Sequence, residues 1–296
     1  MDASEEIGNF PYFLRNPIAA LAGGSSRALG EDVGCYRPCM PTVARINVTP
    51  VKSSTLHHPD EVRLESFGPT HDREFFFIDA DGKRFGGDAK APLMGIRAEF
   101  DVEGDRLMMR LPNGDQAEGS AAANGDAISV TYDGRRVPEH LIEDDWYGFL
   151  SDHVGRNVRL ARLDEPGTLV DEGVTIVSLA SVEELGRRAE RETPDPRRFR
   201  MTFELDGCEP HEEDTWTGRR IGIGEAELVV GGPVPRCVIT TLDPDTGRHD
   251  FPTLKVIAGY RKLMPDEGAP FGVYAQVSRP GTVRVGDEVE PRDGDS

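Results

Sequence analysis

The chain has 296 residues, of which 37% are hydrophobic and 29% charged, and its formal net charge is −19. This length suits one large or two ordinary domains, each able to bury a core. The acidity disfavours phosphate backbones and anionic surfaces, so we expect neither nucleic acid nor a membrane as a partner. No run reaches the ~18 consecutive apolar residues of a membrane span, and residues 1–6 are acidic where a secretory signal is basic. We therefore expect a cytoplasmic protein.

The first half reads as an extension followed by short strands. Residues 1–42 lack sustained periodicity, so we expect an N-terminal extension there. Alternating apolar positions then predict strands at 43–51, 62–64, 75–78, 107–109 and 128–132. Turn signals lie beside several of them, namely Asp81-Gly82, Asn113-Gly114 and Asp133-Gly134. Helical spacing predicts a helix over 139–154, in which His153 is expected to pack rather than bind a metal. A barrel or sandwich is the expected architecture.

The second half mixes strands with two helices. The segment 164–167 suggests a boundary, which gives an extension at 1–42, a first module at 43–165 and a second at 166–292. A strand over 174–179 is followed by a helix, whose start Ser181 and Glu184 mark as a Ser-x-x-Glu capping box. Further strands are expected near 200–206, 220–230, 235–241, 273–277 and 282–289, with a second helix over 252–263. The predicted fold class is mainly β with a few helices, α+β overall.

We expect the four cysteines to be free thiols or metal ligands, because disulfides are rare in the cytosol. Cys35 and Cys39 could form a small metal site with His57-His58, or be two free thiols in the extension. Cys208 is expected to pack.

Cys237 has the most reason to be reactive. It follows Arg236 and precedes the turn Asp243-Pro244-Asp245-Thr246-Gly247. A neighbouring positive charge lowers a thiol pKa, and the thiolate is the form that attacks or binds metal. From the residues alone, a small buried hydrophobe remains the alternative.

A longer string of motifs surrounds this cysteine. In order, it contains Phe199-Arg200, Glu213-Asp214-x-Trp216, Arg236-Cys237, Asp243-Pro-Asp-Thr-Gly247, Leu254-Lys255, Tyr260-Arg261, Phe271-Gly272 and Pro280-Gly-Thr-Val-Arg-Val-Gly-Asp287. The first half adds Thr49-Pro50-Val51-Lys52-Ser53 and Gly68-Pro-Thr-His-Asp72-Arg73. Together these segments resemble the MOSC domain with its N-terminal β-barrel module, in the amidoxime-reducing-component branch. The resemblance covers roughly residues 43–290 and implies a β-barrel MOSC fold.

The resemblance implies a molybdenum cofactor held between the two modules. Cys237 would be the metal ligand and the catalytic residue, since a soft thiolate suits a metal bound to dithiolene sulfur. Arg offers phosphate and pterin a planar fork, and Lys offers a point charge. Ser181 could add helix-start N–H groups, its alternative being a plain cap. The implied cofactor-binding set is Lys52, Ser53, Arg73, Ser181, Arg200, Thr202 and Arg236.

Several positions depart from the family pattern. The family's Phe-Arg-Pro-Asn reads Phe199-Arg200-Met201-Thr202, so a hydroxyl replaces an amide. Thr49 stands where the family has Tyr, and Lys90 is a candidate replacement for a missing Arg. These departures bear on the substrate and on the pterin contacts.

The resemblance implies a molybdenum-dependent oxidoreductase that reduces N-hydroxylated or N-oxygenated small molecules or transfers oxygen. The chain has no Cys-x4-Cys-x2-Cys or Gly-x-Gly-x-x-Gly motif, so we expect a separate electron-donor protein. We expect a monomer. The alternatives are a non-catalytic carrier or sulfur- and cofactor-transfer protein, and a purely structural member without cofactor.

Overall fold

The computed structural model describes residues 40–83, 85, 91–132, 135–142, 146–167, 173–265 and 268–292. These residues belong to one compact unit that begins at Pro38. Cys35, Cys39, Lys90 and the Asp133-Gly134 turn lie outside the described residues, so the predictions made for them have no structural counterpart.

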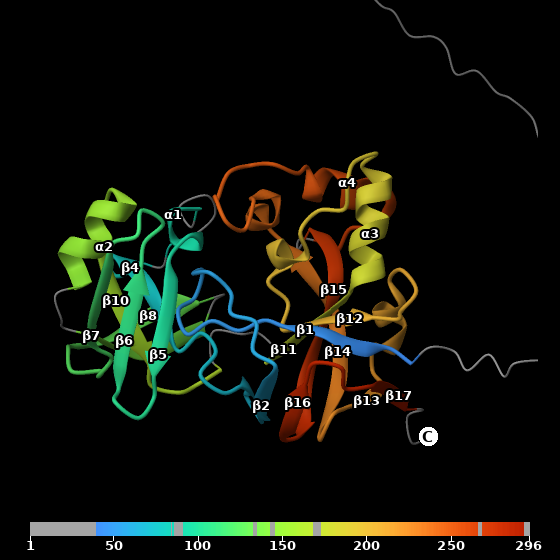
Figure 1. The fold of residues 1–296 in the computed structure, drawn as a ribbon, viewed down its shortest axis with the longest axis horizontal. Helices are drawn as coiled ribbons and strands as arrows, with labels where there is room; N and C mark the ends of the chain where they lie inside the picture. The colour runs from blue at the N-terminus through green and yellow to red at the C-terminus, as the bar shows by residue number, and fades with distance from the viewer. Residues whose placement is uncertain are drawn as a thin grey trace, which may run out of the picture. The chain divides into compact units, whose positions relative to one another are not determined.

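A seven-stranded sheet, nearly closed into a barrel, forms the larger part of the fold (Figure 1). Its pairs are antiparallel except for β11 with β12. Buried apolar side chains fill it, with Trp216 and Phe203 among the largest. In spatial order the strands are β1 (Thr42–Ile46), β12 (Phe203–Asp206), β11 (Val174–Ser178), β15 (Ala269–Arg279), β14 (Ala226–Arg236), β13 (Arg220–Ile223) and β17 (Val289–Arg292).

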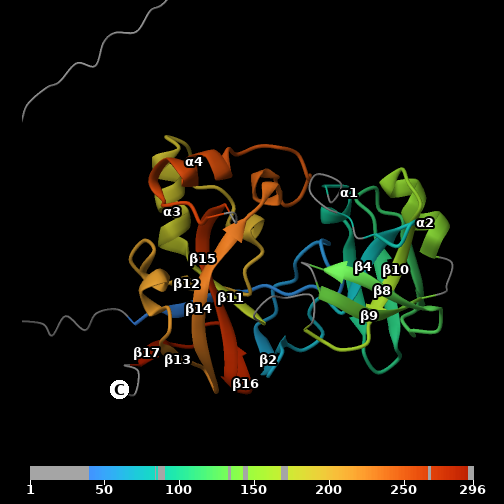
Figure 2. The same ribbon diagram turned by 180° about the vertical axis from the view of Figure 1, so that it is seen from behind.

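A second group of strands lies beside this barrel (Figures 1 and 2). One sheet has the order β4 (Phe75–Asp79), β10 (Val158–Leu163), β9 (Arg135–Leu141) and β8 (Ala127–Tyr132). Another consists of β5 (Arg97–Asp101), β6 (Arg106–Arg110) and β7 (Gln116–Ser120). The helices α1 (Ala91–Met94) and α2 (Trp146–Val154) belong to this group. Its own apolar core includes Phe75, Leu107 and Leu160.

The first strands of the chain join sheets with strands from the second half. β1 pairs with β12. A three-stranded sheet has the order β16 (Gly281–Arg284), β2 (Glu61–Glu65) and β3 (Gly68–Pro69). The two halves are therefore joined by backbone ladders, and the division at 1–42, 43–165 and 166–292 stays a prediction.

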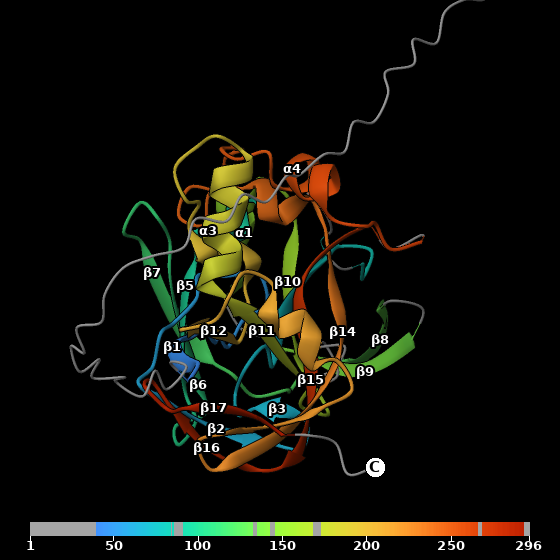
Figure 3. The ribbon, with the colours of Figure 1, turned by 90° about the vertical axis from the view of Figure 1, so that its right-hand side faces the viewer.

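Two helices, α3 (Leu179–Arg188) and α4 (Thr253–Tyr260), cover one end of the barrel (Figure 3). They pack on an apolar cluster that includes Val182, Leu185 and Ile257. The described residues also form three short 3₁₀ turns: η2 (Pro196–Phe199), η3 (Glu212–Trp216) and η4 (Val238–Thr241). Within the described part of the chain, no helix is long and apolar enough to cross a membrane.

The mainly β prediction is confirmed, but several predicted elements were wrong in detail. The strand predicted at 220–230 is two strands, β13 and the start of β14, and the strand predicted at 282–289 ends with β16 at Arg284, before β17 begins at Val289. Strand β9 takes up the start of the helix predicted at 139–154, because it pairs with both β8 and β10; α2 begins at Trp146. The N-cap of α3 is Ser178, whose hydroxyl accepts from the Ser181 amide at 3.0 Å, so Ser181 is not the cap. The strand predicted at 235–241 ends at Arg236, and η4 follows it.

Candidate functional site

Cys237 lies where strand β14 ends and the turn η4 begins. Its backbone carbonyl accepts from the amide of Thr240 at 3.2 Å and from the hydroxyl of Thr240 at 3.0 Å. Thr241 repeats the pattern, with its hydroxyl 2.6 Å from the Val238 carbonyl. These local bonds favour a tight turn over a continued strand. The Cys237 side chain is exposed, so its sulfur is accessible to a ligand.

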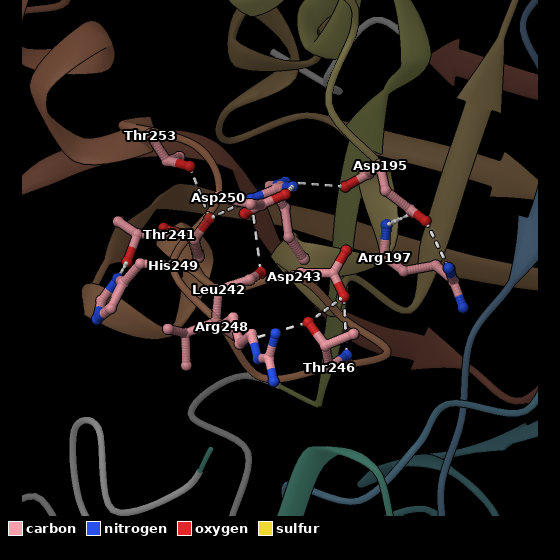
Figure 4. A network of polar contacts seen from close by, with 12 residues as sticks. Asp195, Arg197, Thr241, Leu242, Asp243, Thr246, Arg248, His249, Asp250 and Thr253 are labelled. Carbon is pink, nitrogen blue, oxygen red and sulfur yellow. Dashed lines mark hydrogen bonds and ion pairs between the residues drawn. The ribbon is translucent and has the colours of Figure 1, made fainter. Parts of the chain in front are cut away.

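The turn predicted at 243–247 is present, and Figure 4 shows the Thr246 side chain bonded to Asp243. Asp243 Oδ1 accepts from the amide and the hydroxyl of Thr246, each at 2.8 Å. Both carboxylate oxygens of Asp245 accept hydrogen bonds from the Arg197 guanidinium, at 2.9 and 2.8 Å. These bonds, followed by those to Asp195, raise the pKa of Arg197 above its ordinary value.

A buried arginine of η2 and the first threonine of α4 hold this loop. Arg198 is 2% exposed and forms a two-pronged ion pair with Asp250, at 3.0 and 2.8 Å. The same guanidinium donates to the carbonyl of Thr240 at 3.1 Å. The Thr253 hydroxyl donates to that same carbonyl at 2.6 Å. The loop that carries Cys237 is thus fixed from both sides.

The loop that carries Cys237, residues 237–247, is called the thiol loop below. Arg236 holds its N-terminal end. Its guanidinium donates to the carbonyls of Phe271 (2.8 Å) and Phe199 (3.0 Å), and it contacts the Met201 sulfur at 2.6 Å. It lies over the Phe199 ring at 5.4 Å. Burial lowers the Arg236 pKa to about 10. With these contacts within the protein, Arg236 acts to position Cys237, while its predicted contact with a cofactor stays a prediction.

Residues 199–201 connect Arg236 to the first half of the chain, and we call them the hub segment. Their three consecutive carbonyls accept hydrogen bonds from side chains far away in the sequence. Phe199 accepts from Arg236, Arg200 accepts from Arg73 at 3.1 Å, and Met201 accepts from Asn47 at 2.7 Å. The hub segment therefore links Arg236, at the start of the thiol loop, to Arg73 and Asn47 in the first half of the chain.

Arg73 and Arg200 bring two positive charges together beside this segment. Arg200 donates to the carbonyl of Ser54 at 2.8 Å, and Arg73 pairs with Asp72. Burial, followed by repulsion from Arg73, lowers the Arg200 pKa to about 9. Asp72 also accepts from the amide of Thr49 at 2.8 Å. Arg73 pairs with Asp72 directly and the same carboxylate acts on Arg200 through space, so one negative charge faces two guanidinium groups, which are suited to binding a phosphate.

Three of the predicted site residues have left-handed backbone. The φ angles are 74° at Ser53, 54° at Arg73 and 53° at Arg200. Residues with a Cβ adopt this conformation at a cost of roughly 1 kcal/mol or more. Such residues cluster at ligand sites, where the surrounding structure holds them in place. The three positions come from two distant parts of the sequence and support one common site.

The remaining predicted residues differ in accessibility. Lys52 is half-buried, and its amide donates to the Phe75 carbonyl at 2.7 Å. Thr202 is 1% exposed and exchanges hydrogen bonds with Thr175. Ser181 is fully buried and donates to Glu213 at 2.9 Å. The last two hydroxyls have partners inside the protein, and their contacts with a cofactor stay predictions.

Sequence reasoning missed Asn47. It is fully buried, and its amide nitrogen donates to Met201 and to Glu204 (3.0 Å). Its oxygen Oδ1 has no partner among the residues that the structure describes. A buried acceptor without a donor is costly, so a ligand N–H would relieve it. The available signal was a polar residue between the apolar Ile46 and Val48.

The other sequence hypotheses have simple outcomes. Cys208 and Cys237 are free thiols, and Cys208 packs against the barrel core, where burial raises its pKa. His153 is bonded to the Pro92 carbonyl at 2.9 Å, as expected of a packing residue. His57 contacts the Ala98 carbonyl at 2.6 Å. In the described ranges, no group of three or more His, Cys, Asp or Glu could hold a metal ion.

These observations together fit a molybdenum cofactor. An exposed thiol offers a soft ligand, two close cations offer a place for phosphate, and a buried acceptor offers a partner for a pterin N–H. Arg73 and Asn47 bond to the hub segment directly, and Arg236, the neighbour of Cys237 in the chain, does so as well.

Comparison with known proteins identifies two domains in the chain. Residues 40–157 match the MOSC N-terminal beta barrel domain, and residues 151–290 match the MOSC domain. The chain therefore belongs to the family of proteins that join these two domains.

Its curated relatives are mitochondrial amidoxime-reducing components. Component 1 of Mus musculus is 38% identical over 121 residues, which are 38% of this chain and 35% of that protein. Component 2 of Homo sapiens is 37% identical over 121 residues, with the same coverage of 38% and 35%. The matched segment thus spans about a third of the length of these relatives.

Solved structures are similar only at a distance. The YUAD protein from Bacillus subtilis is 13% identical with a TM-score of 0.41, covering 86% of this chain and 97% of that one. YiiM from Geobacillus stearothermophilus is 19% identical with a TM-score of 0.32, covering 42% and 55%.

Proposed function

We propose that this chain binds a molybdenum cofactor between the Cys237 loop and the Arg73–Arg200 pair, and that it works as an oxidoreductase. The hub segment carries the proposal. Its successive carbonyls hold Arg236, Arg73 and Asn47, so one short stretch of backbone positions the thiol, the cations and the buried acceptor. Precise placement of such groups by a rigid scaffold is what cofactor binding requires.

Each residue has a distinct part in this proposal. The Cys237 thiolate would be the protein's ligand to the metal, because soft sulfur suits this metal. Arg73 and Arg200 would hold the phosphate with planar forks, and Lys52 would add a point charge. Asn47 would accept from a pterin N–H. When bound, the cofactor supplies a metal centre that accepts two electrons and exchanges an oxygen atom.

The substrate class we propose is N-hydroxylated compounds. This proposal is based on the relatives that share the matched segment, which are named amidoxime-reducing components. The reaction takes one N–OH group, two electrons and two protons, and it gives N–H and water. We further propose that a separate protein supplies the electrons. Monomeric state and a cytoplasmic location stay predictions.

The cofactor content of the purified protein tests the proposal. We expect close to one molybdenum per chain in wild type and in Cys208→Ala, the matched cysteine control. Cys237→Ala should lose the metal or alter its absorption spectrum, because the only proposed protein ligand is gone. A wild-type protein made with abundant cofactor that holds neither molybdenum nor pterin would overturn the proposal.

Turnover separates an oxidoreductase from a cofactor carrier or transfer protein. The loaded protein is mixed with a chemical electron donor and benzamidoxime, and formation of benzamidine is followed. Turnover that is lost in Cys237→Ala supports the oxidoreductase. A fully loaded protein that passes its cofactor to an apo-enzyme but reduces no N-hydroxylated compound would instead be a carrier.

A further inference from the structure

A groove lies between α3 and α4, away from the residues assigned to the cofactor. Its volume is about 660 Å³, within the range of small-molecule sites. Figure 3 shows the two helices next to each other at one end of the barrel. The groove is lined by Arg188, Ala189, Arg191, Pro252, Lys255, Val256, Gly259 and Tyr260.

The charge of this groove is opposite to that of the chain. The protein has 53 acidic and 34 basic residues. Yet three cations, Arg188, Arg191 and Lys255, line the groove, and no carboxylate appears in the described lining. A concave surface with one sign of charge concentrates the opposite ion. The groove is therefore a place where a small anion would gather.

Two of these cations have partial explanations within the fold. Arg188 pairs with Glu184 at 2.5 Å and lies over the Tyr260 ring at 5.1 Å. Arg191 donates to the Asp250 carbonyl at 3.2 Å. Both residues are also near the C-terminal end of α3, where the helix dipole favours positive charge.

Lys255 has no such explanation. It is the third residue of α4, and a cation in the first helical turn is disfavoured by the helix dipole. Its side chain is exposed, and it has no hydrogen-bond or ion-pair partner among the described residues. The chain contains only five lysines. An exposed ammonium group at the start of a helix and beside a cavity is available to a ligand anion.

The remaining lining is apolar. Tyr260, Val256 and Ala189 offer an aromatic ring and aliphatic surface. Ligand sites commonly combine such surface with a few convergent polar groups. We propose that this groove binds a small organic anion, whose carboxylate or phosphate group meets Lys255 and Arg191 and whose apolar body packs on Tyr260 and Val256. This proposal does not rest on the proposed function.

The groove is connected to the thiol loop. Arg191 contacts Asp250, whose carboxylate holds Arg198. Arg198 in turn donates to Thr240, which lies three residues beyond Cys237. An anion that draws Arg191 away from Asp250 would therefore act on the segment that carries the thiol.

Calorimetric titration of the full chain tests the binding site. The probes are benzoate, phenyl phosphate and inorganic phosphate, with wild type, Lys255→Gln and Arg191→Gln. We expect saturable binding to wild type and at least tenfold weaker binding to both variants. Lys262→Gln, which removes an exposed lysine just beyond α4 and outside the groove, should bind as wild type does.

The outcomes distinguish the anion. Binding of benzoate alone identifies a carboxylate site, and binding of phenyl phosphate alone identifies a phosphate-ester site. Inorganic phosphate should bind more weakly than phenyl phosphate, and equal affinity for the two would overturn the proposed packing on Tyr260 and Val256. Thermal unfolding of each variant shows whether it is folded. No saturable binding by folded wild type, or equal binding by Lys255→Gln, would overturn the proposal, as would equal weakening by Lys262→Gln.

Discussion

Arg73 donates a hydrogen bond to the backbone carbonyl of Arg200 at 3.1 Å, and both residues have left-handed backbone. The bond goes from one cation to the main chain of the other, so it joins the two residues without neutralising either charge. Among the described residues, the carboxylate of Asp72 acts on Arg200 against the repulsion from Arg73. An anion bound here would gain from both guanidinium groups and would offset their mutual repulsion.

The first prediction concerns the shape of this cation pair. Arg200→Lys keeps the charge but removes the planar fork and its bond to Ser54. We expect the molybdenum content of the purified protein to fall severalfold while the fold remains. Arg110→Lys, at an exposed position on β6, is the control. Full metal content in Arg200→Lys would show that charge alone suffices.

The second prediction concerns the packing of the thiol loop. Gly247 has φ 66°, and a Cβ there would lie 2.6 Å from the carbonyl oxygen of Ala91. Gly114 also has positive φ, at 94°, but a Cβ there meets nothing within 4 Å. Gly114→Ala should cost about 1 kcal/mol of unfolding free energy from backbone strain alone. Gly247→Ala should cost about 1–3 kcal/mol more, since the backbone must shift.

Urea unfolding of the two variants measures this difference. Equal losses would mean that the loop moves freely away from α1. A larger loss in Gly247→Ala, together with faster alkylation of Cys237 by iodoacetamide, would show that this contact fixes the thiol loop.

Much of the architecture could be predicted from local patterns. Period-two alternation marked β2 and β8, short apolar runs marked β4 and β6, and Asn113-Gly114 marked the turn between β6 and β7. The Asp243–Gly247 turn was predictable because Asp and Thr bond to nearby backbone and Gly tolerates positive φ. These features depend on neighbours in the sequence, and so a short window contains them.

The rest depends on contacts between distant residues. β9 took residues predicted as helix because two neighbouring strands supply its hydrogen bonds. The left-handed conformations of Arg73 and Arg200 are imposed by tertiary structure, and no local propensity indicates them. Asn47 was missed because its importance lies in a carbonyl 154 positions away.

The third prediction follows from the corrected start of α3. Ser178 caps the helix, so Ser178→Ala should lower the unfolding free energy by about 1–2 kcal/mol. Ser129→Ala, at an exposed position on β8, should change it by less than about 0.5 kcal/mol. Chemical denaturation of the two variants measures both values. Equal losses of unfolding free energy in the two variants would contradict a capping role for Ser178.

The basis of the last prediction is His211, which lies beneath the α3–α4 end of the barrel. Its ring packs edge-on against Phe271, at 5.5 Å between centroids, and Nε2 lies 3.2 Å from the Tyr260 hydroxyl. Its Nδ1 is buried without a partner in the described residues. Burial, followed by the positive charge of Arg261, lowers the pKa of His211 to about 4, although Glu184 acts in the opposite direction.

The fourth prediction is that His211 makes the protein less stable in mild acid. The unfolded chain takes up a proton at this imidazole below about pH 6.5, but the folded chain does so only near pH 4. Its contribution is therefore complete above about pH 6.5 and is lost as the pH falls towards 4, by at most about 3 kcal/mol. His211→Asn, chosen because Asn tolerates φ 62°, should flatten this loss.

Glu213 and Asp214 have pKa values raised by burial and act in the opposite sense in both proteins, so the difference between the two proteins isolates the imidazole. Urea unfolding at about pH 7, 5.5 and 4.5 measures it, and parallel pH profiles would contradict a neutral buried His211.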